Sequence, residues 1–242
     1  MKPRVSVVVT AYNEGEAILA PLRRLLEAVT LPCEILVVVD SPDDTSFPWV
    51  EKLSRDDDRI RGVLNTFGPG PARAIRYGFA EAVAPVVVVT MADGCDDPHQ
   101  IDSLARLVER GVVVAAASRY ARGGQQIGAP LLKGMMSRAA GMSLRLFARV
   151  GTWDATNSFK AYSKEFVDTV GIESDAGFEV GIELVAKARR YRLPVAEIPT
   201  IWLERQSGVS NFKIRQWIPR YMRWYRFAFG RPIALEPETG AR

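Results

Sequence analysis

Residues 86–98, VVVVTMADGCDDP, decide how this sequence folds and where its chemistry lies. The first five, VVVVT, are an apolar, β-branched run of the kind that forms a strand buried inside a parallel sheet. Three carboxylates follow directly, those of Asp93, Asp96 and Asp97. Ligands of parallel α/β sheets bind beyond the carboxyl ends of the strands, so these carboxylates are predicted to lie at the ligand edge.

The local sequence leaves two interpretations of this acidic loop open. A hard divalent cation such as Mg²⁺ or Mn²⁺ binds through one or two carboxylates and completes its shell with water and substrate phosphates. Alternatively, the loop is a solvated turn in which Asp96 or Asp97 caps a helix that begins near Pro98. The first interpretation predicts a metal site, and the second predicts only a helix boundary.

The segments around this loop alternate between short β-branched runs and helical patterns, which is typical of parallel βαβ units. We therefore predict an α/β fold, Rossmann-like, with a mostly parallel central sheet flanked by helices. The predicted strands are 5–10, 34–40, 62–64, 86–90 and 112–118, and the predicted helices are 16–29, 71–83 and 99–110. The loops that leave the strands at their carboxyl ends are 10–14, 40–45, 91–98 and 118–120.

Length and composition are those of a globular protein. The chain has 242 residues, of which 48% are hydrophobic and 25% are charged, which excludes disordered, collagen-like and disulfide-framework proteins. Cys33 and Cys95 form neither a framework nor a zinc-ligand spacing, so we expect a reducing, cytosolic setting. The longest stretch without a charged residue, 82–92, is too short to span a bilayer. The first residues, MKPRVSVVVT, are interpreted as a strand and not as a signal peptide.

Charge is segregated along the chain. Counting Lys and Arg against Asp and Glu gives −5 for 1–118, +6 for 119–160, −2 for 161–200 and +5 for 201–242. Such asymmetry points to an anionic partner, which is a nucleic acid, a membrane surface or a phosphorylated substrate. No recognisable nucleic-acid-binding module accompanies the basic blocks, so we expect no nucleic-acid partner.

Several catalytic classes are disfavoured by what the sequence lacks. His99 is the only histidine, so a Ser-His-Asp hydrolase or a zinc enzyme would have little to build on. No GxSxG, Walker A or HExxH motif is present. The segment 68–71, GPGP, lacks the third glycine of a dinucleotide fingerprint and reads better as a turn and helix start.

Two arginine-rich segments have helical patterns. Over 214–229, arginines occupy one face and mostly aromatic residues the other. This pattern fits an interfacial membrane helix, and it equally fits an amphipathic helix packed on the protein's own core. Over 137–150, Arg138, Arg145 and Arg149 form a second stripe. Arg119 ends a predicted strand, which puts a guanidinium at the same sheet edge as Asp93, where it could hold phosphate oxygens.

The ordered motifs resemble the family 2 glycosyltransferases, in the branch of dolichyl- or polyprenyl-phosphate mannosyltransferases. They are VSVVVTAYNE, EILVVVDSPDDT, GPARAIRYGFAEA, VVVVTMADGCDDP, ASRY, DATNSFKAY, GFEVGIELVAKA and ERQSGVSNFK. The resemblance covers 5–225 and implies a GT-A fold, a nucleotide-sugar donor, Mg²⁺ or Mn²⁺ and a polyprenyl phosphate acceptor.

The resemblance also implies roles for the residues of the nucleotide side. Ala11, Tyr12 and Glu14 match the loop that holds the base and ribose, and Asp40 matches a nucleotide-binding aspartate. The DxD motif of the family falls on 91–93, MAD. Met91 replaces its first aspartate, so Asp93 is the expected metal and diphosphate ligand, helped by Asp96. Ala92, the middle residue of the motif, is expected to belong to the donor site.

Further roles concern the phosphates and the acceptor. Arg119, Lys133 and Ser137 match positions that face the donor phosphates and the acceptor phosphate. Arg205 and Lys213 lie in the RxxGxSxFK segment, which resembles a loop that closes over the site. On this basis Asp93, Arg119, Lys133, Ser137 and Arg205 are the expected catalytic residues, and Lys213 joins the donor-binding set.

The implied reaction is inverting transfer of a sugar, mannose from GDP-mannose, to polyprenyl or dolichyl phosphate. A lipid phosphate is already anionic, so its attack needs no general base. Alternatives are a UDP-sugar (glucose or N-acetylglucosamine) with a different acceptor, and a catalytically impaired nucleotide-sugar-binding protein, which Met91 raises. We expect a cytoplasmic protein, peripheral at the inner membrane face, with a homo-oligomer or a separate membrane anchor protein as further partners.

The resemblance divides residues 1–232, expected to be a single GT-A domain, into functional parts. A nucleotide-binding half covers 1–118, an acceptor-binding half covers 119–213, and an amphipathic interfacial helix covers 214–230. A flexible tail over 233–242 is expected to follow.

Overall fold

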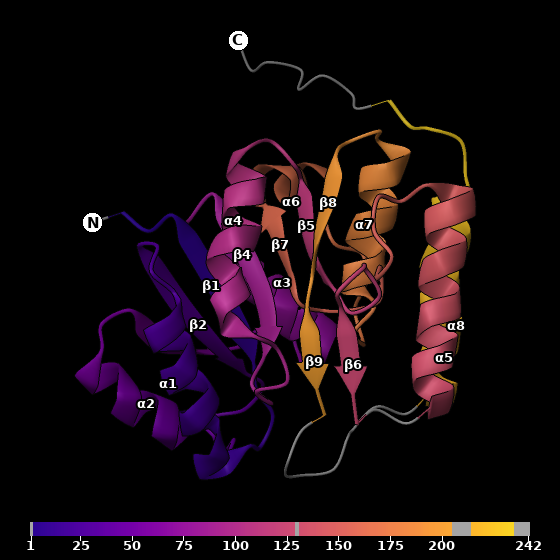
Figure 1. The fold of residues 1–242 in the computed structure, drawn as a ribbon. Coiled ribbons are helices and arrows are strands. Elements are labelled where there is room, and N and C mark those ends of the chain that lie inside the picture. The colour runs from indigo at the N-terminus through magenta and orange to yellow at the C-terminus, as the bar shows by residue number, and fades with distance from the viewer. Residues whose placement is uncertain (1, 129–130, 205–213, 235–242) are drawn as a thin grey trace.

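A computed structural model describes residues 2–128, 131–204 and 214–234, with the backbone alone for 131–133 and 214–217. Its centre is a seven-stranded sheet in the order β3–β2–β1–β4–β7–β5–β8 (Figure 1). β7 runs antiparallel to its neighbours β4 and β5, and the other pairs of this sheet are parallel. The strands are β1 (Val5–Thr10), β2 (Cys33–Val39), β3 (Ile60–Leu64), β4 (Val86–Met91), β5 (Val114–Ser118), β7 (Lys160–Ser163) and β8 (Val195–Pro199). A separate two-stranded sheet pairs β6 (Gln125–Ile127) with β9 (Ile201–Leu203).

Helices cover both faces of the sheet, so the fold is a three-layer α/β arrangement, as predicted. One apolar cluster joins the sheet to α1 (Leu19–Ala28), α2 (Phe47–Asp56) and α4 (Ile101–Glu109). A second cluster joins the other face to α3 (Pro71–Glu81), α6 (Lys164–Val170), α7 (Val180–Arg190) and α8 (Ile214–Ala228). The remaining helices are α5 (Leu131–Ser143) and η3 (Leu144–Ala148), a π-helical continuation of α5, with 3₁₀ turns at Gly15–Ile18 and Pro98–Gln100. Gly78 allows α3 to approach β1 closely, because a Cβ there would come within 2.3 Å of a Val8 methyl carbon.

Strands and helices of the first half were predictable, and those of the second half were largely not. Every strand predicted up to residue 118 is present, with ends shifted by at most two residues. The sequence patterns did not predict α2, α6, α7 or the strands β6, β7, β8 and β9, whereas the helical pattern over 137–150 falls largely within α5 and η3. These missed strands are short, and β8 is only partly buried along its length, so neither a long apolar run nor a clean alternation marks them.

The C-terminal helix is present, but its aromatic face is buried against the protein. Trp224 is 2% exposed, and its indole N–H donates to Ser174 Oγ at 3.0 Å. The Tyr225 hydroxyl lies 2.9 Å from Ser143 Oγ at the end of α5. For the described part of α8, packing on the protein's own core is therefore the correct interpretation, and the expectation that this face enters a membrane is wrong. Burial of the aromatic rings outweighs any interfacial preference once α7 supplies an apolar surface.

A buried ion pair supports the surface on which α8 packs. The Lys187 ammonium lies 2.7 Å from Glu183 Oε1 and 5.3 Å from the Trp224 ring centroid. Glu183 also accepts the backbone N–H groups of Glu173 and Ser174, at 2.7 and 2.9 Å. The loop that meets Trp224 is thus fixed to α7. Among the described residues, no helix is long and apolar enough to cross a membrane, and the predicted tail lies outside the described residues from 235 onward.

Trp224→Ala should lower the free energy of unfolding by about 3–5 kcal/mol, because it removes a large buried side chain and leaves a cavity. Ile218→Ala, on the exposed side of the same helix, is the matched control and should change stability little. Chemical denaturation of both variants measures the difference. Equal stability of the two variants would contradict the packing of this aromatic face.

Candidate active site

The loops predicted to carry the site do converge at one edge of the sheet. Thr10 pairs with Val38 of β2 on one side and with Met91 of β4 on the other. Because six strands of the sheet share one direction, their carboxyl ends open onto the same side. β7 enters this edge from the opposite direction, and its first residue, Lys160, pairs with Val89 of β4 and Ala116 of β5. The turn that precedes β7 therefore lies between the ends of β4 and β5.

A buried aspartate that the sequence analysis did not single out ties two loops together. Asp44 Oδ2 accepts the backbone N–H of Asn13 at 3.0 Å, and its other oxygen accepts that of Ser46 at 2.8 Å. The Glu14 N–H donates to Ser46 Oγ at 2.9 Å. Loop 11–14 is thereby held against loop 44–46, with Tyr12 left 60% exposed at the edge.

Asp40, the predicted nucleotide-binding aspartate, fastens the turn before α3. Its Oδ1 accepts from Asn65 Nδ2, and its Oδ2 accepts the Gly70 N–H, both at 2.8 Å. Asn65 also donates to the Gly68 carbonyl at 2.7 Å. The GPGP segment is therefore a turn and helix start, as interpreted, with α3 beginning at Pro71.

The three aspartates of the acidic loop after β4 have different roles. Asp97 Oδ1 accepts the His99 N–H at 3.1 Å and caps the short 3₁₀ helix, so the capping interpretation holds for this residue. Asp93 Oδ1 accepts the Cys95 N–H at 3.1 Å, and Asp96 Oδ2 accepts from Thr90 Oγ1 at 2.8 Å. Burial, reinforced by the negative charge of Asp93, raises the pKa of Asp96 to about 7.

These two carboxylates fit a divalent cation that is completed by its substrate. Met91, in place of the first DxD aspartate, turns its thioether to Thr10 Oγ1 at 3.3 Å and offers no oxygen ligand. No group of three or more His, Cys, Asp or Glu residues that could hold a metal occurs in the described ranges. Asp93 and Asp96 repel each other, and a cation would remove that repulsion. One or two carboxylates with phosphate oxygens and water are a donor set that Mg²⁺ accepts.

Arg119 is held by a buried aspartate that sequence reasoning missed. Its Nε and Nη2 donate to the two oxygens of Asp154 at 2.7 and 2.9 Å, and its backbone N–H donates to the same carboxylate at 3.0 Å. The side chains are 10% and 0% exposed. Burial alone would raise the pKa of Asp154, but the attraction and hydrogen bonds of Arg119 outweigh it, and the pKa is lowered. The Nη1 group of Arg119 makes no hydrogen bond to a described residue.

Ser137 joins this cluster from α5. Its Oγ lies 2.6 Å from Thr156 Oγ1 and 3.4 Å from Arg119 Nη2. Gly141 permits this approach, since a Cβ there would lie 2.0 Å from the Trp153 carbonyl oxygen. The backbone of Lys133 is one turn earlier in α5, and its side chain, like the whole of Arg205 and Lys213, lies outside the described residues.

The turn before β7 contributes further buried polar groups. Asn157 Nδ2 donates to the Ala117 carbonyl at 2.9 Å, which fixes the turn to β5. The Lys160 ammonium donates to the carbonyls of Ala155 and Asn157, and burial lowers the pKa of Lys160 to about 8. The sequence did contain one indication that Asp154 is important. Segment 119–160 has seven basic residues, and Asp154 is its only acidic residue.

Glu179, at the start of α7, is a third carboxylate that the sequence patterns did not single out. The side chain is 2% exposed, and Oε1 accepts the Gly177 N–H at 3.2 Å. Its Oε2 is buried and has no hydrogen-bond partner among the described residues. The first turn of α7 packs on the turn before β7, because a Cβ at Gly181 would lie 3.0 Å from the Asn157 carbonyl oxygen. A buried carboxylate oxygen without a described donor therefore lies at the start of the helix that packs on the turn before β7.

Comparison with known proteins agrees with this architecture. Residues 6–171 match the family described as glycosyl transferase family 2. The chain belongs to this family and is a glycosyltransferase. The crystal structure of glucosyl-3-phosphoglycerate synthase from Mycobacterium tuberculosis with Mn²⁺, UDP-glucose and phosphoglyceric acid has a TM-score of 0.68 at 18% identity, and the match covers 96% of this chain and 81% of that one. This likeness shows the fold, which is of the GT-A type, as predicted.

Curated relatives of this glycosyltransferase are named for transfer to lipid phosphates. Polyprenol monophosphomannose synthase of Mycolicibacterium smegmatis is 29% identical over 230 residues, which cover 88% of this chain and 86% of the relative. Undecaprenyl-phosphate mannosyltransferase of Micrococcus luteus is 25% identical over 212 residues, covering 86% and 87%. Dolichol-phosphate mannosyltransferase of Pyrococcus furiosus is 29% identical over 230 residues, covering 91% of this chain and 64% of that protein.

Asp154→Asn should lower the free energy of unfolding by about 3–5 kcal/mol near neutral pH, because it leaves the Arg119 guanidinium buried without its counter-charge. Arg119 lowers the pKa of Asp154 below its ordinary value of 3.8, so this contribution is present above that pH and is lost as the pH falls through the folded-state pKa. The gap between wild type and variant should therefore shrink below pH 3.8.

Glu109→Gln is the matched control for this measurement. Glu109 accepts two hydrogen bonds from Arg4, at 2.9 and 2.7 Å, so the geometry is also bidentate, but the pair is exposed. Exposed ion pairs contribute little to stability, so the control should unfold almost as wild type does. Urea titrations of both variants at several pH values give the comparison, and equal losses would show that burial of the Asp154 pair carries no special cost.

Proposed function

We propose that this glycosyltransferase transfers mannose from GDP-mannose to a polyprenyl or dolichyl phosphate with inversion at the anomeric carbon. The observation that carries the proposal is the cluster of Arg119, Asp154 and Ser137 at the same sheet edge as Asp93. It offers one buried guanidinium with a free Nη1 edge for phosphate, and a hydroxyl beside it. In this proposal, 1–118 binds the nucleotide and 119–213 binds the acceptor.

The chemistry proposed for this site needs charge neutralisation and alignment rather than proton transfer. The acceptor phosphate is anionic at neutral pH, so its oxygen attacks the anomeric carbon without a base. Arg119 stabilises charge on the phosphates, and Ser137 orients one phosphate through its hydroxyl. Asp93, helped by Asp96, would hold Mg²⁺ or Mn²⁺, which would neutralise the departing diphosphate. Ala11, Tyr12, Glu14, Asp40, Ala92 and Lys213 form the proposed donor site, and Lys133 and Arg205 complete the proposed phosphate set.

Glu179 adds a reason to expect a sugar in this site. Its unpartnered Oε2 is buried beside the turn that holds Arg119. A buried carboxylate oxygen without a donor is costly, and a sugar hydroxyl would supply the missing hydrogen bond. We therefore assign Glu179 to recognition of the transferred sugar.

Transfer of radiolabelled mannose from GDP-mannose to undecaprenyl phosphate tests the reaction. Asp93→Asn should reduce turnover by about two orders of magnitude or more, since it removes a charge at the developing diphosphate, while leaving the unfolding midpoint unchanged. Asp97→Asn is the matched control in the same loop, and it should retain most of the activity because Asp97 only caps a 3₁₀ helix.

Other outcomes of this assay identify the alternatives. Transfer from UDP-glucose or UDP-N-acetylglucosamine, with none from GDP-mannose, would replace the proposed donor. Nucleotide-sugar binding without transfer to any polyprenyl phosphate would support a catalytically impaired nucleotide-sugar-binding protein, the alternative suggested by Met91. The proposed reaction would then be wrong. Retained turnover in Asp93→Asn would remove Asp93 from the site.

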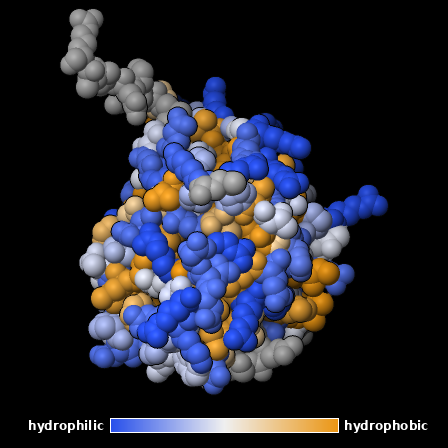
Figure 2. Space-filling model, turned by 90° about the vertical axis from the view of Figure 1, so that its left-hand side faces the viewer, coloured by the Kyte–Doolittle hydropathy of each residue, from blue (hydrophilic) through white to orange (hydrophobic). Residues whose placement is uncertain are grey.

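We also propose that the enzyme works peripherally at a membrane surface, with α5 and η3 as the contact. Met135, Met142, Leu146 and Phe147 are exposed on this helical segment, Phe147 to 75%. It lies with α8 at one end of the molecule, far from α1 and α2 (Figure 1). On the side shown in Figure 2, by contrast, hydrophilic side chains break up the apolar ones.

Charge favours an anionic lipid surface for this segment. The single acid of 119–160, Asp154, is buried and paired, whereas Arg138 on α5 is exposed. An apolar stripe flanked by arginine is typical of helices that lie in the headgroup region. Ser137 projects from α5 into the candidate site, so the same helix would connect the proposed membrane contact with the phosphate-binding cluster. Instead of lipid, a second copy of the chain or a separate anchor protein could cover this surface of α5 and η3, and a binding test can reveal either.

Phe147→Glu should weaken co-sedimentation with phosphatidylglycerol vesicles about tenfold, because it removes an apolar contact and adds a repelled charge. Val83→Glu is the matched control, since Val83 is also exposed, at 56%, but lies after α3 on another part of the molecule. Equal binding of the two variants would overturn the assignment of the contact to η3. Loss of self-association on analytical ultracentrifugation, with vesicle binding intact, would assign the surface to a second copy.

A further inference from the structure

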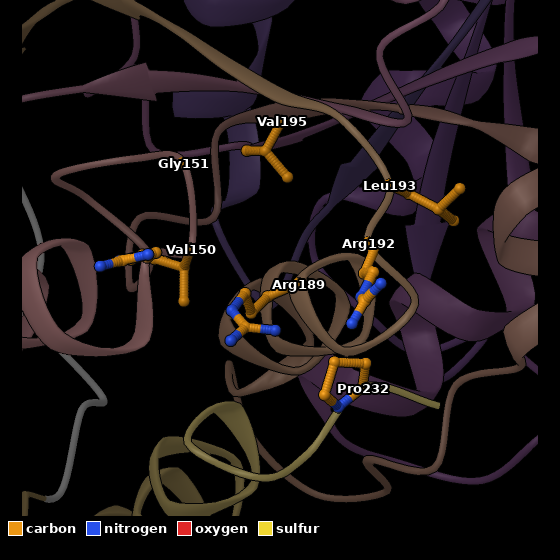
Figure 3. A pocket seen from close by; sticks show the side chains of 8 residues that line it. Val150, Gly151, Arg189, Arg192, Leu193, Val195 and Pro232 are labelled. Carbon is orange, nitrogen blue, oxygen red and sulfur yellow. The ribbon is translucent and has the colours of Figure 1, made fainter. Parts of the chain in front are cut away.

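A cavity of about 380 Å³, shown in Figure 3, lies away from the candidate active site. It forms where η3 and α7 end and where β8 begins, which is the amino edge of the parallel strands. Figure 3 shows Arg189 and Arg192 beside Pro232, Leu193 next to Arg192, and Val195 on the far side of the two arginines from Pro232. The proposed reaction makes no use of this cavity.

The cavity is strongly basic. Arg149, Arg189 and Arg192 line it, and none of the described lining residues is acidic. Arg189 donates its Nε–H to the carbonyl of Ala148, at the end of η3. Within the described part of the chain, the side chains of Arg149 and Arg192 form neither an ion pair nor a hydrogen bond. Two exposed arginines therefore line the cavity, and no described residue supplies them with a counter-charge.

Local structure does not explain arginine at these two positions. Arg149 and Arg192 have φ values of 58° and 56°, in the left-handed region that glycine and asparagine adopt most readily. Among the described residues, only Asn13 is another non-glycine residue with positive φ. A cation near a helix carbonyl end is favourable, but Arg189 already fills that role here. Neither the backbone conformation nor the nearby helix end therefore explains why arginine occupies these two positions.

We propose that this arginine pocket, formed by Arg149, Arg189 and Arg192, binds a small phosphorylated compound. Planar guanidinium groups pair with phosphate oxygens through two parallel hydrogen bonds, and two of them suit a ligand with at least two negative charges. Val150, Leu193 and Val195 supply an apolar wall for the rest of the ligand. The volume lies within the usual range for sites of small molecules.

Inorganic pyrophosphate is the probe that tests this site in the full-length protein, with EDTA present. Hydrogen–deuterium exchange should show protection of 148–151 and 189–195. Arg149→Gln/Arg192→Gln should abolish that protection and raise the calorimetric Kd about tenfold or more. The reason is that each substitution removes a charge-assisted hydrogen bond to the phosphate, and such bonds are stronger than neutral ones. Arg23→Gln/Arg55→Gln, which removes two exposed arginines from α1 and α2, is the charge-matched control and should bind as wild type does.

Two further arms keep the test decisive. If the double glutamine variant unfolds, Arg149→Lys/Arg192→Lys keeps the charge and loses the bidentate geometry, and it should bind more weakly than wild type. If phosphatidylglycerol vesicles protect these segments and pyrophosphate does not, the phosphate belongs to a lipid headgroup. Protection confined to the carboxyl edge of the sheet, or equal pyrophosphate binding by the glutamine variant and its control, would overturn the proposal.

Discussion

The buried ion pair between Arg119 and Asp154 is the contact on which the candidate active site depends. Neither charge is stable alone in this environment, because removing one partner leaves the other desolvated and unpaired. The pair therefore locks the end of β5 to the turn before β7, and Ser137 and Thr156 attach α5 to the same point. Its bidentate geometry uses Nε and Nη2 of Arg119 and leaves Nη1 directed elsewhere, which is how a structural ion pair can also offer a phosphate-binding edge.

One reversed strand makes this arrangement possible. The turn before a parallel strand lies at the amino edge of a sheet, away from ligands, whereas β7 runs antiparallel between β4 and β5. Its preceding turn is thereby delivered to the carboxyl edge, between the acidic loop after β4 and Arg119. The buried Lys160, whose pKa is lowered to about 8 by burial, holds that turn through the carbonyls of Ala155 and Asn157.

How much could be predicted differs between the two halves of the chain. Most strands of the first half are marked by apolar or β-branched runs, and four of the five are followed by a loop that was placed at the ligand edge, so pattern alone put Asp93, Asp40 and Arg119 there. The pattern of 214–229 was equally compatible with two environments, and only the presence of α7 beneath Trp224 decides between them. Asp96 and Asp97 are neighbours in the sequence but differ in role. Asp96 is buried and repelled by Asp93, whereas Asp97 caps a 3₁₀ helix.

The sequence by itself determined the α/β class, the family and the loops that carry the chemistry, because these follow from local periodicity and from motifs that are contiguous in the chain. The tertiary structure alone decided which carboxylate neutralises Arg119, that Asp44 and Glu179 are buried beside the site, and which helical face stays exposed. Asp154 is 35 residues from Arg119, and pairing at that separation depends on the direction of β7. No local pattern encodes that direction, since strand pairing is settled by packing across the whole sheet.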